Sequence, residues 1–573
     1  MNRTLWKNKF LLLFFAASIE MVVSIIVFLS DTVIAGYAVG ETGISAMNIM
    51  SPIVSFTIFI SCLIATGVAY SYNSAIGKAD KKHADGLFGM GIMLSAGLSV
   101  LVFIIITLFR DLYFEFLNPN INILKHSHDY YSYYKYVILT DPMITLFTTM
   151  IYNDGDELLS SVSDIVQIIV NIACSLFFAI VLDMGLKGIA LGTLVKNIVS
   201  AIILSFHFFS KSNSLKPEIY FSFRDLWEIC KNGFVDVGHY LTIGVLSFIL
   251  SKFVIIKFGD IFLPVLSIAL NLLELPAVFV GIAEAASPLI SVYYYEKNYP
   301  AVRKVMNIAM KFLMFEGIIF SVILFIFAEY VPSAFNIEEP ELVKHSVYAL
   351  RIISSTFAFL SVFCLWESYY IIQRKNMIVM ISLFLRSLIF IPLLAIPLGL
   401  FFGLNGVWLG FAFTPILALI VCSLIICMKY GRESFPYYLD DKNNIADFDV
   451  VLTPANVIKL RDDAEKFLSE RSIPSKTINK IMLIIEETGM TIIEQNKGKK
   501  ILSEYTIEII KSHSVRLIVR DNGKIFDITD KNSQIKSFRN YFFAQLMSMK
   551  KLKDNENMTV ISNNRNIFTI PLS

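Results

Sequence analysis

The chain has 573 residues, of which 55% are hydrophobic and 17% charged, and its mean hydropathy is +0.64. Soluble domains are about a quarter charged, so this composition excludes a soluble enzyme for most of the chain and predicts a membrane protein. The net charge of +2 gives no reason to expect a nucleic-acid partner. The six cysteines lie in apolar runs without metal-ligand spacing, so we expect no disulfides.

Apolar segments long enough to cross a membrane follow one another as far as residue 428. A hydrocarbon core about 30 Å thick requires roughly 20 apolar residues of helix. By this measure the sequence predicts a mainly α-helical membrane protein with twelve transmembrane helices. The expected spans are 10–38, 44–72, 84–109, 127–152, 158–182, 186–209, 226–258, 262–294, 301–328, 343–372, 378–400 and 404–428.

Lysine and arginine cluster in alternate short loops, as they do on the cytoplasmic side of membrane proteins. The loops after the second, sixth, eighth and tenth expected spans are basic, whereas the opposite loops are acidic or uncharged. This distribution predicts a multi-pass protein of the cytoplasmic membrane with both termini in the cytoplasm. One loop, 153–157, should be cytoplasmic and is nevertheless acidic.

The membrane part contains an internal repeat. The stretch 30–48 returns 223 positions later, so that Gly36 corresponds to Gly259 and Asn48 to Asn271. A second pair of blocks, 185–192 and 403–410, matches at an offset of 218. Two independent matches at nearly one offset indicate a duplication. We therefore predict two six-helix lobes, 1–218 and 219–432, which point the same way because six is an even number.

Acidic residues occur where a membrane helix should be apolar. A carboxylate at mid-bilayer costs roughly 2.5–3.5 kcal/mol on insertion scales, so it requires partners or a function. Asp31 follows about twenty apolar residues, and Glu20 lies eleven positions earlier on the same helix face. Asp31 is the main candidate for a functional acid, and the alternative is a structural hydrogen bond to a neighbouring helix.

Other ionisable residues in the expected spans are candidates for lining a substrate cleft. For each of them a structural role, as a helix-end residue or a satisfied packing histidine, is the alternative. Asp236 and His239 are three residues apart and fall on one helix face. The full set of cleft candidates is Glu20, Asp141, Asp164, Asp236, His239, Glu274 and Glu284.

Several motifs resemble the MATE (multidrug and toxic compound extrusion) family. The sequence SDTVIAG at 30–36 resembles its first-helix signature, AIGKADKK at 75–82 its loop after helix two, and 185–192 and 403–410 its openings of helices six and twelve. The resemblance covers about residues 5–430. It implies a V-shaped pair of lobes that exports small organic, often cationic, compounds across the lipid membrane, driven by H⁺ or Na⁺ entry. It also implies a monomer that needs no cofactor.

The same resemblance implies a cation-coupling site. Asp31 matches the family's coordinating or protonated acid, Asn171 matches the asparagine of its helix five, and Thr193 the threonine of its helix six. Ser175 stands where the family has a second acid. Because a hard cation prefers several oxygens and more than one negative charge, this departure weakens a Na⁺ site at Asp31. Both H⁺ and Na⁺ remain open.

A polar segment, 433–573, follows the last span and is long enough for one small domain. Thr453 and Pro454 have the features of a helix cap and first turn. The pattern predicts a cytoplasmic α/β sandwich. Its elements are a strand 447–452, helices 453–471 and 474–496, strands 503–511 and 515–520, a helix 538–550, and strands 558–562 and 566–571.

Two stretches of this tail resemble the GHKL ATPases, especially the anti-sigma-factor kinases. They are IIEETGMT at 484–491 and VRDNGKIFD at 519–527. The resemblance assigns Glu487 to polarising an attacking group, and Asp521, beside Gly523, to binding adenine. Thr491 replaces the asparagine that ligates Mg²⁺, and the sequence has no glycine after Gly523 for a phosphate-binding lid. We therefore expect a degenerate domain that binds Mg-ATP weakly or serves only for docking, with Asn522 and Gly523 forming a turn.

The leading interpretation is a secondary exporter, not an enzyme, whose tail regulates it through nucleotide or a cytoplasmic protein partner. One alternative is a lipid-linked sugar flippase, which Lys196, Lys252, Lys257 and Arg386 keep open. Another is a membrane-tethered anti-sigma-type signalling protein. A pump driven by ATP is not expected, because the tail has no Walker phosphate-binding motif.

Overall fold

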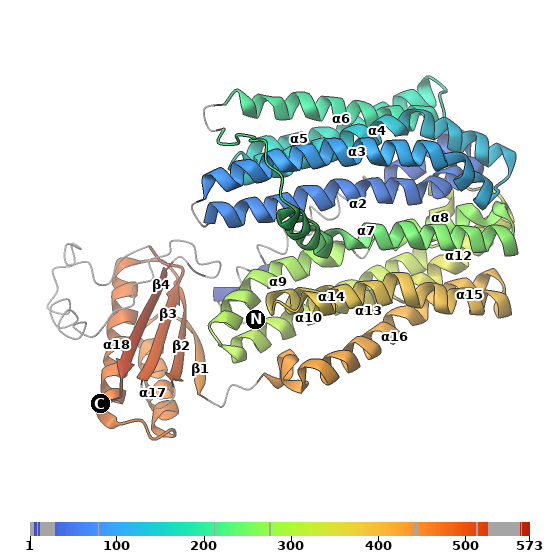
Figure 1. Cartoon of the computed structure of the whole chain (residues 1–573). Coiled ribbons are helices and arrows are strands. Elements are labelled where there is room, and N and C mark those ends of the chain that lie inside the picture. The colour runs from blue at the N-terminus through green and yellow to red at the C-terminus, as the bar shows by residue number, and fades with distance from the viewer. Residues whose placement is uncertain are drawn as a thin grey trace.

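The protein consists of a long helical body with a small sheet domain at one end (Figure 1). We call the end of the body beside this domain the sheet-side end, and the other the far end. The computed structural model describes residues 5–7, 10–11, 29–77, 80–210, 213–273, 275, 277–439, 444–510, 514–524, 562 and 564–572.

Long helices of the first half run back and forth along the body (Figure 1). A helix at Leu29–Val39 covers the end of the first expected span. The helices that follow are α2 (Glu41–Gly77), α3 (Lys81–Leu117), α4 (Ile121–Asn153), α5 (Glu157–Leu176), which continues as a π-helical turn (Phe177–Val181), and α6 (Leu186–Phe208).

The second half repeats this pattern with more interruptions. Its helices are α7 (Phe223–Lys257), α8 (Leu263–Leu272), α9 (Ala277–Tyr295), α10 (Tyr299–Phe327), α11 (Val331–Ala334), α12 (Pro340–Ser354), α13 (Phe357–Ile372), α14 (Asn376–Leu383), a π-helical stretch (Phe384–Ile389), α15 (Phe390–Phe402) and α16 (Leu404–Tyr430).

Within the described residues, 8 helices are long and apolar enough to cross a membrane, or 9 if α12 and α13, bent by 45°, count as one span. The count of twelve is therefore not reached by length and composition alone. The eighth expected span is divided into α8 and α9, and Pro276 stands in the sequence between them. The fourth is one continuous helix, α4, and much of the first lies outside the described residues.

The repeated glycine blocks have the same structural role in both places. Gly185 and Gly403 precede α6 and α16 with φ angles of 55° and 70°, which favour glycine. A Cβ at Gly188 would lie 2.4 Å from the Ala179 nitrogen, and one at Gly406 would lie 2.0 Å from the Leu398 carbonyl oxygen. The repeat thus allows two helix pairs, α5–α6 and α15–α16, to pack at backbone contact.

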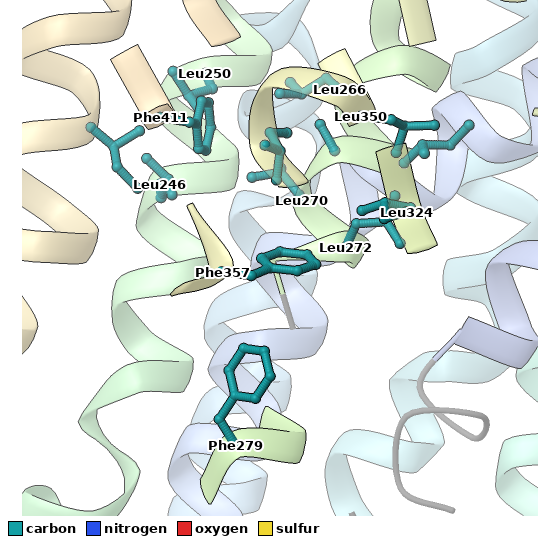
Figure 2. Close-up of a cluster of buried hydrophobic side chains, with 14 of the residues drawn as sticks. Leu246, Leu250, Leu266, Leu270, Leu272, Phe279, Leu324, Leu350, Phe357 and Phe411 are labelled. Atoms are coloured by element: carbon teal, nitrogen blue, oxygen red, sulfur yellow. The ribbon is translucent and has the colours of Figure 1, made fainter. Parts of the chain in front are cut away.

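Helices α2 and α7 form the main contact between the two halves. A Cβ at Gly67 would lie 2.2 Å from the carbonyl oxygen of Ile229, so the two backbones touch. Elsewhere along the pair, the rings of Phe59 and Phe234 meet edge to face at 5.7 Å. The apolar core continues beside α7, where Leu250, Phe411 and Leu270 lie among the buried side chains in Figure 2.

The tail folds as a four-stranded antiparallel sheet with two helices. Its elements are β1 (Ile445–Val451), α17 (Pro454–Ser469), α18 (Ser475–Gln495), β2 (Leu502–Ile510), β3 (Ser514–Asp521) and β4 (Asn564–Pro571), and the strand order is β1-β2-β3-β4. The Thr453 hydroxyl accepts from the Asn456 amide at 3.2 Å, which is the predicted cap. The expected helix 538–550 and, apart from Ser562, the expected strand 558–562 lie outside the described residues.

The two faces of this sheet have different coverings. Tyr505 and Leu517 belong to the apolar core that the sheet forms with α17 and α18. Because side chains alternate between the faces of a strand, Glu504 and Thr506 point to the opposite face. We call this opposite side the outer face. It meets the helical body.

Candidate functional site

Asp31 lies in the helix Leu29–Val39 and is hydrogen-bonded to α5. The side-chain amide of Asn171 donates to its Oδ1 atom at 3.2 Å. Asn171 is buried and Asp31 is partly buried. The Oδ1 atom of Asn171 is buried and has no hydrogen-bond partner among the described residues.

The other two predicted coupling residues, Thr193 and Ser175, form hydrogen bonds with the backbone of α6. The hydroxyls of Thr193 and Ser175 both donate to the carbonyl oxygen of Ile189, at 3.2 and 3.5 Å. A Cβ at Gly192 would lie 2.5 Å from Ser175 Oγ, so this glycine leaves room for the serine between α5 and α6. The structure therefore joins Asp31 to Asn171 but shows no hydrogen bond from either hydroxyl to Asp31.

Three residues that sequence reasoning did not place at this site surround Asp31. Lys196 of α6 is close enough to attract the carboxylate, and Tyr130 and Tyr134 of α4 lie within its electrostatic reach. The two tyrosine rings stack at 5.1 Å. Helical periodicity contained this signal, because Lys196 follows Thr193 by three residues and shares its face.

Polar groups continue from Asp31 along α4. Tyr134 is near Asp31 and also near Asp141, which lies two turns further along the helix. Asn197 of α6 donates to Thr140 Oγ1 at 3.0 Å and approaches Asp141 Oδ1 at 3.5 Å. Because α4 runs from the far end to the sheet-side end, Asp141 lies on the sheet side of Asp31. We call Asp31, Tyr134 and Asp141 the polar file.

The structure describes the side chains of only two of the remaining cleft candidates. Asp164 is exposed and accepts from the Gln167 side chain at 3.4 Å. The ring of His239 is half-buried and lies 3.9 Å from that of Tyr240. Glu20 and Glu274 lie outside the described residues, and so do the side chains of Asp236 and Glu284. These assignments stay predictions.

The second half contains an ion pair within its helices. Arg386, in the π-helical stretch, lies 3.6 Å from Glu367 of α13, which also accepts from the Ser382 hydroxyl at 3.1 Å. Glu316 of α10 and both members of this pair lie within electrostatic reach of Cys364, and the buried Oε2 atom of Glu316 has no hydrogen-bond partner among the described residues. Arg386 was named from the sequence only in support of the flippase alternative, and its pairing with Glu367 was not predicted.

At the far end, hydrogen bonds between backbone groups and side chains join the two halves. The amide of Asn120 donates to Asp260 at 2.6 Å, and the amide of Glu339 donates to Glu41 at 3.1 Å. The side chain of Asn336 donates to the Gly36 carbonyl at 3.1 Å. In this conformation the far end is therefore joined across the halves next to the helix that carries Asp31.

A pocket of about 320 Å³ lies between α2, α3 and α7. The one polar side-chain group in its wall, the Tyr113 hydroxyl, is occupied because it donates to the Ile49 carbonyl at 2.6 Å. The pocket therefore offers apolar contacts. It is lined by Pro52, Ile53, Phe56, Ile106, Tyr113, Leu241, Gly244, Val245 and Phe248.

The residues predicted to bind nucleotide lie on α18 and at the end of β3. Asp521 Oδ1 accepts from the Gly523 amide and from Asn564, both at 2.8 Å. Its Oδ2 atom is buried without a hydrogen-bond partner among the described residues, and burial raises the pKa of Asp521 to about 6. Glu487 and Thr491 lie one turn apart on α18. One oxygen of the predicted adenine acceptor is thus already hydrogen-bonded within the protein.

Long apolar helices, an internal repeat and a carboxylate held among membrane helices together define a polytopic membrane transporter. The chain matches the MatE family model over residues 16–177 and 239–396, more than half of its length. It therefore belongs to the MATE family. As a member of this family it is a secondary transporter rather than an enzyme, and it requires no cofactor. The family match ends before the tail, so the ATPase resemblance stays a prediction.

The chain is similar to multidrug export proteins that share about a fifth of its residues in the aligned region. The chain is 20% identical to the multidrug export protein MepA of Staphylococcus saprophyticus over 308 residues, 52% of this chain and 67% of that protein. It is 21% identical to MepA of Staphylococcus aureus strain MRSA252 over 399 residues, 68% of this chain and 86% of that protein.

Solved structures share the fold. An inward-facing multidrug resistance MATE transporter of the MOP superfamily has a TM-score of 0.66 at 19% identity, covering 71% of this chain and 94% of that one. An outward-facing MATE structure has a TM-score of 0.59 at 19% identity, covering 74% and 96%. A MOP superfamily transporter from Pyrococcus furiosus, described as having a binding pocket of reverse polarity, has a TM-score of 0.60 at 18% identity and the same coverage.

Proposed function

We propose that the protein is a proton-coupled exporter of small organic compounds, often cationic, in which Asp31 is the coupling group. The observation that carries this proposal is the Asp31–Asn171 hydrogen bond inside a membrane helix pair. A carboxylate in that place is costly unless it has a function. The names of the MepA relatives support multidrug export as the direction and cargo.

The residues around Asp31 fit a proton better than Na⁺. Asp31 supplies the acidic group, Asn171 turns its amide N–H toward it, and Lys196 adds a positive charge nearby. Thr193 and Ser175 direct their hydroxyls to a backbone carbonyl. A hard cation requires several oxygen ligands, whereas a proton requires one carboxylate oxygen. Na⁺ remains the second candidate ion.

Protonation of Asp31 changes the balance between two states of the transporter. The ionised carboxylate attracts Lys196 and accepts from Asn171, which holds the Asp31 helix against α5 and α6. The neutral acid loses most of the attraction to Lys196. Proton binding therefore favours a state in which this contact is relaxed, and substrate favours the state that binds it better. The polar file provides the route by which the proton leaves toward the sheet-side end.

The proposal includes the architecture that the sequence predicts. The two lobes are 1–218 and 219–432, with twelve spans in the cytoplasmic membrane and the tail, 433–573, in the cytoplasm. The protein functions as a monomer. The tail regulates transport and retains at most weak Mg-ATP binding at Glu487 and Asp521.

The flippase alternative rested on four basic residues, and three of them have partners within the protein. They therefore do not support a site for a sugar phosphate. Arg386 pairs with Glu367, Lys252 donates to the Phe116 carbonyl, and Lys196 faces Asp31. A sugar phosphate would have to compete with these contacts.

Purified protein in liposomes distinguishes the two coupling ions. With a fluorescent organic cation as substrate, an imposed pH gradient alone should drive transport, and a Na⁺ gradient at equal pH should not. Transport that follows only the Na⁺ gradient would overturn proton coupling. Transport of neither kind, with any of several organic cations, would overturn the exporter assignment.

A further inference from the structure

The outer face of the tail sheet contacts the turn between α9 and α10 through buried charged groups. Arg520 of β3 lies between Glu504 of β2, at 3.0 Å, and Glu296 in the turn. The side chains of Arg520 and Glu504 are both fully buried. Arg565 of β4 binds the other carboxylate oxygen of Glu296 at 2.6 Å. One glutamate of the helical body therefore receives two arginines of the tail.

The neighbouring strand β1 contacts the first turns of α10. Lys304 lies 2.9 Å from Asp447, whose side chain is 2% exposed, and 3.8 Å from Asp449. Asn298 approaches Asp447 and Thr506 at 3.4 Å each. A positive group of the body here faces two acids of the tail, which is the reverse of the arrangement at Glu296. The surfaces are complementary in charge at both ends of the contact.

The same face also contacts the beginning of the chain. Trp6 donates a side-chain hydrogen bond to Asp449, and Lys7 is near the same carboxylate. Phe10 lies against Phe312 of α10, with ring centroids 5.7 Å apart. Trp6 and Lys7 immediately precede the expected span 10–38, which carries Asp31. The tail thus contacts the residues just before the Asp31 span and the second lobe at once.

Isolated charges on the outer face would be unfavourable if the face were covered by an apolar surface, because each buried charge needs a partner. Here Glu504, Arg520 and Asp447 have partners supplied by the sheet itself, by the turn or by the first turns of α10. The face is therefore specific for this turn. It is a docking surface whose partner is the transporter to which it is joined.

We infer that the tail is a clamp that docks on the α9–α10 turn and on the residues just before the first expected span, and that it slows transport while docked. Alternating access moves one lobe against the other. A rigid sheet that contacts both the second lobe and the residues leading into the first span opposes this motion. Undocking releases it. The inference rests on the proposed exporter function for its readout, but the docking contact itself does not depend on the cargo.

The test uses the full chain in lipid nanodiscs and liposomes. Glu296→Ala removes the partner that both arginines share. Lys304→Ala disrupts the second half of the contact independently. Glu338→Ala is the matched control, because Glu338 is an exposed acid at the far end. Hydrogen exchange of residues 293–304 and 502–510 reports docking, and the initial rate of organic-cation transport reports regulation.

We expect Glu296→Ala and Lys304→Ala to increase exchange in both segments and to raise the transport rate several-fold, while Glu338→Ala changes neither. Combining Lys304→Asp with Asp447→Lys should restore protection and the slow rate. Unchanged exchange in both alanine variants would overturn the docking surface. Increased exchange with an unchanged or lower transport rate would overturn the clamp. A wild-type chain that moves no substrate would refute the exporter assignment, and the exchange comparison would still decide the docking.

Discussion

Asn48 and Asn271 occupy the same position in the two repeats, and each forms a hydrogen bond to the opposite lobe. Ser251 of α7 donates to Asn48 Oδ1 at 2.8 Å, and Asn271 of α8 donates to Thr32 Oγ1 at 3.3 Å. The duplicated asparagine thus forms a nearly symmetric pair of ties across the lobes. Thr32 follows Asp31 in the sequence, so the Asn271–Thr32 hydrogen bond links the second lobe to the coupling site.

Loss of the Asn48 tie should destabilise this conformation. Ser251→Ala leaves the buried Asn48 Oδ1 without its donor, and an unsatisfied buried acceptor costs about 1–3 kcal/mol. We expect a lower midpoint of thermal unfolding in detergent. Ser205→Ala is the control, because the Ser205 hydroxyl is exposed and bonds within its own helix. Equal midpoints for the two variants would show that the tie does not contribute to stability.

Asp141 should affect proton transfer more than substrate binding. Asp141→Asn keeps the size of the side chain and removes the second acid of the polar file. We expect a several-fold lower rate of proton-driven transport with substrate affinity unchanged, measured by initial uptake rates and by equilibrium binding. If the variant instead weakened substrate binding and left the rate at saturation intact, Asp141 would belong to the substrate cleft.

Docking of the tail should weaken as the cytoplasmic pH rises. Burial, and then the acids Asp447 and Asp449, raise the pKa of Glu504 from 4.5 to about 8, opposed by Arg520 and Tyr293. The docked state therefore binds more protons than an undocked state in which Glu504 is exposed. Its stabilisation is fully present below pH 4.5 and is lost as the pH rises through about 8.

Hydrogen exchange of residues 502–510 measures this effect. Protection should decrease between pH 5.5 and 8.5, after correction for the intrinsic exchange rate, and Glu504→Gln should remove most of the change. Protection that increases with pH would contradict the proposed sign. Burial also raises the pKa of Asp449 to about 6, so part of the decrease should persist in the Glu504 variant. The other charged groups of the contact are Lys7, Glu296, Lys304 and Arg565.

The sequence predicted features that depend on local pattern. Helix positions followed from apolar length, and the strands and helices of the tail within the described residues agree with the predicted ranges within a few residues. The repeated glycine blocks indicated a duplication, and the structure shows that both blocks allow close helix packing, at Gly188 and at Gly406. The Asp31–Asn171 contact followed from the family resemblance, since nothing in the spacing of these two residues places them together.

Features that depend on distant partners were not predicted. The loop 153–157 is acidic, whereas the other short loops expected on the cytoplasmic side are basic. Asp154 and Asp156 hold the buried His207 through its two ring nitrogens, at 2.9 and 3.0 Å. The partner of this loop is thus some fifty residues away in the sequence. The docking of Arg520 on Glu296 spans a still larger separation, and neither residue stands out in its own segment.

The most direct test of proton coupling at Asp31 is substrate-driven proton flux in liposomes that contain the purified chain and an internal pH indicator. We predict that the wild-type protein moves protons when organic cation is added, that Asp31→Asn reduces this flux to the level of protein-free liposomes, and that Glu338→Gln, which changes an exposed acid at the far end, leaves it intact. A wild-type level of substrate-driven proton flux in the Asp31→Asn variant would contradict proton coupling at Asp31.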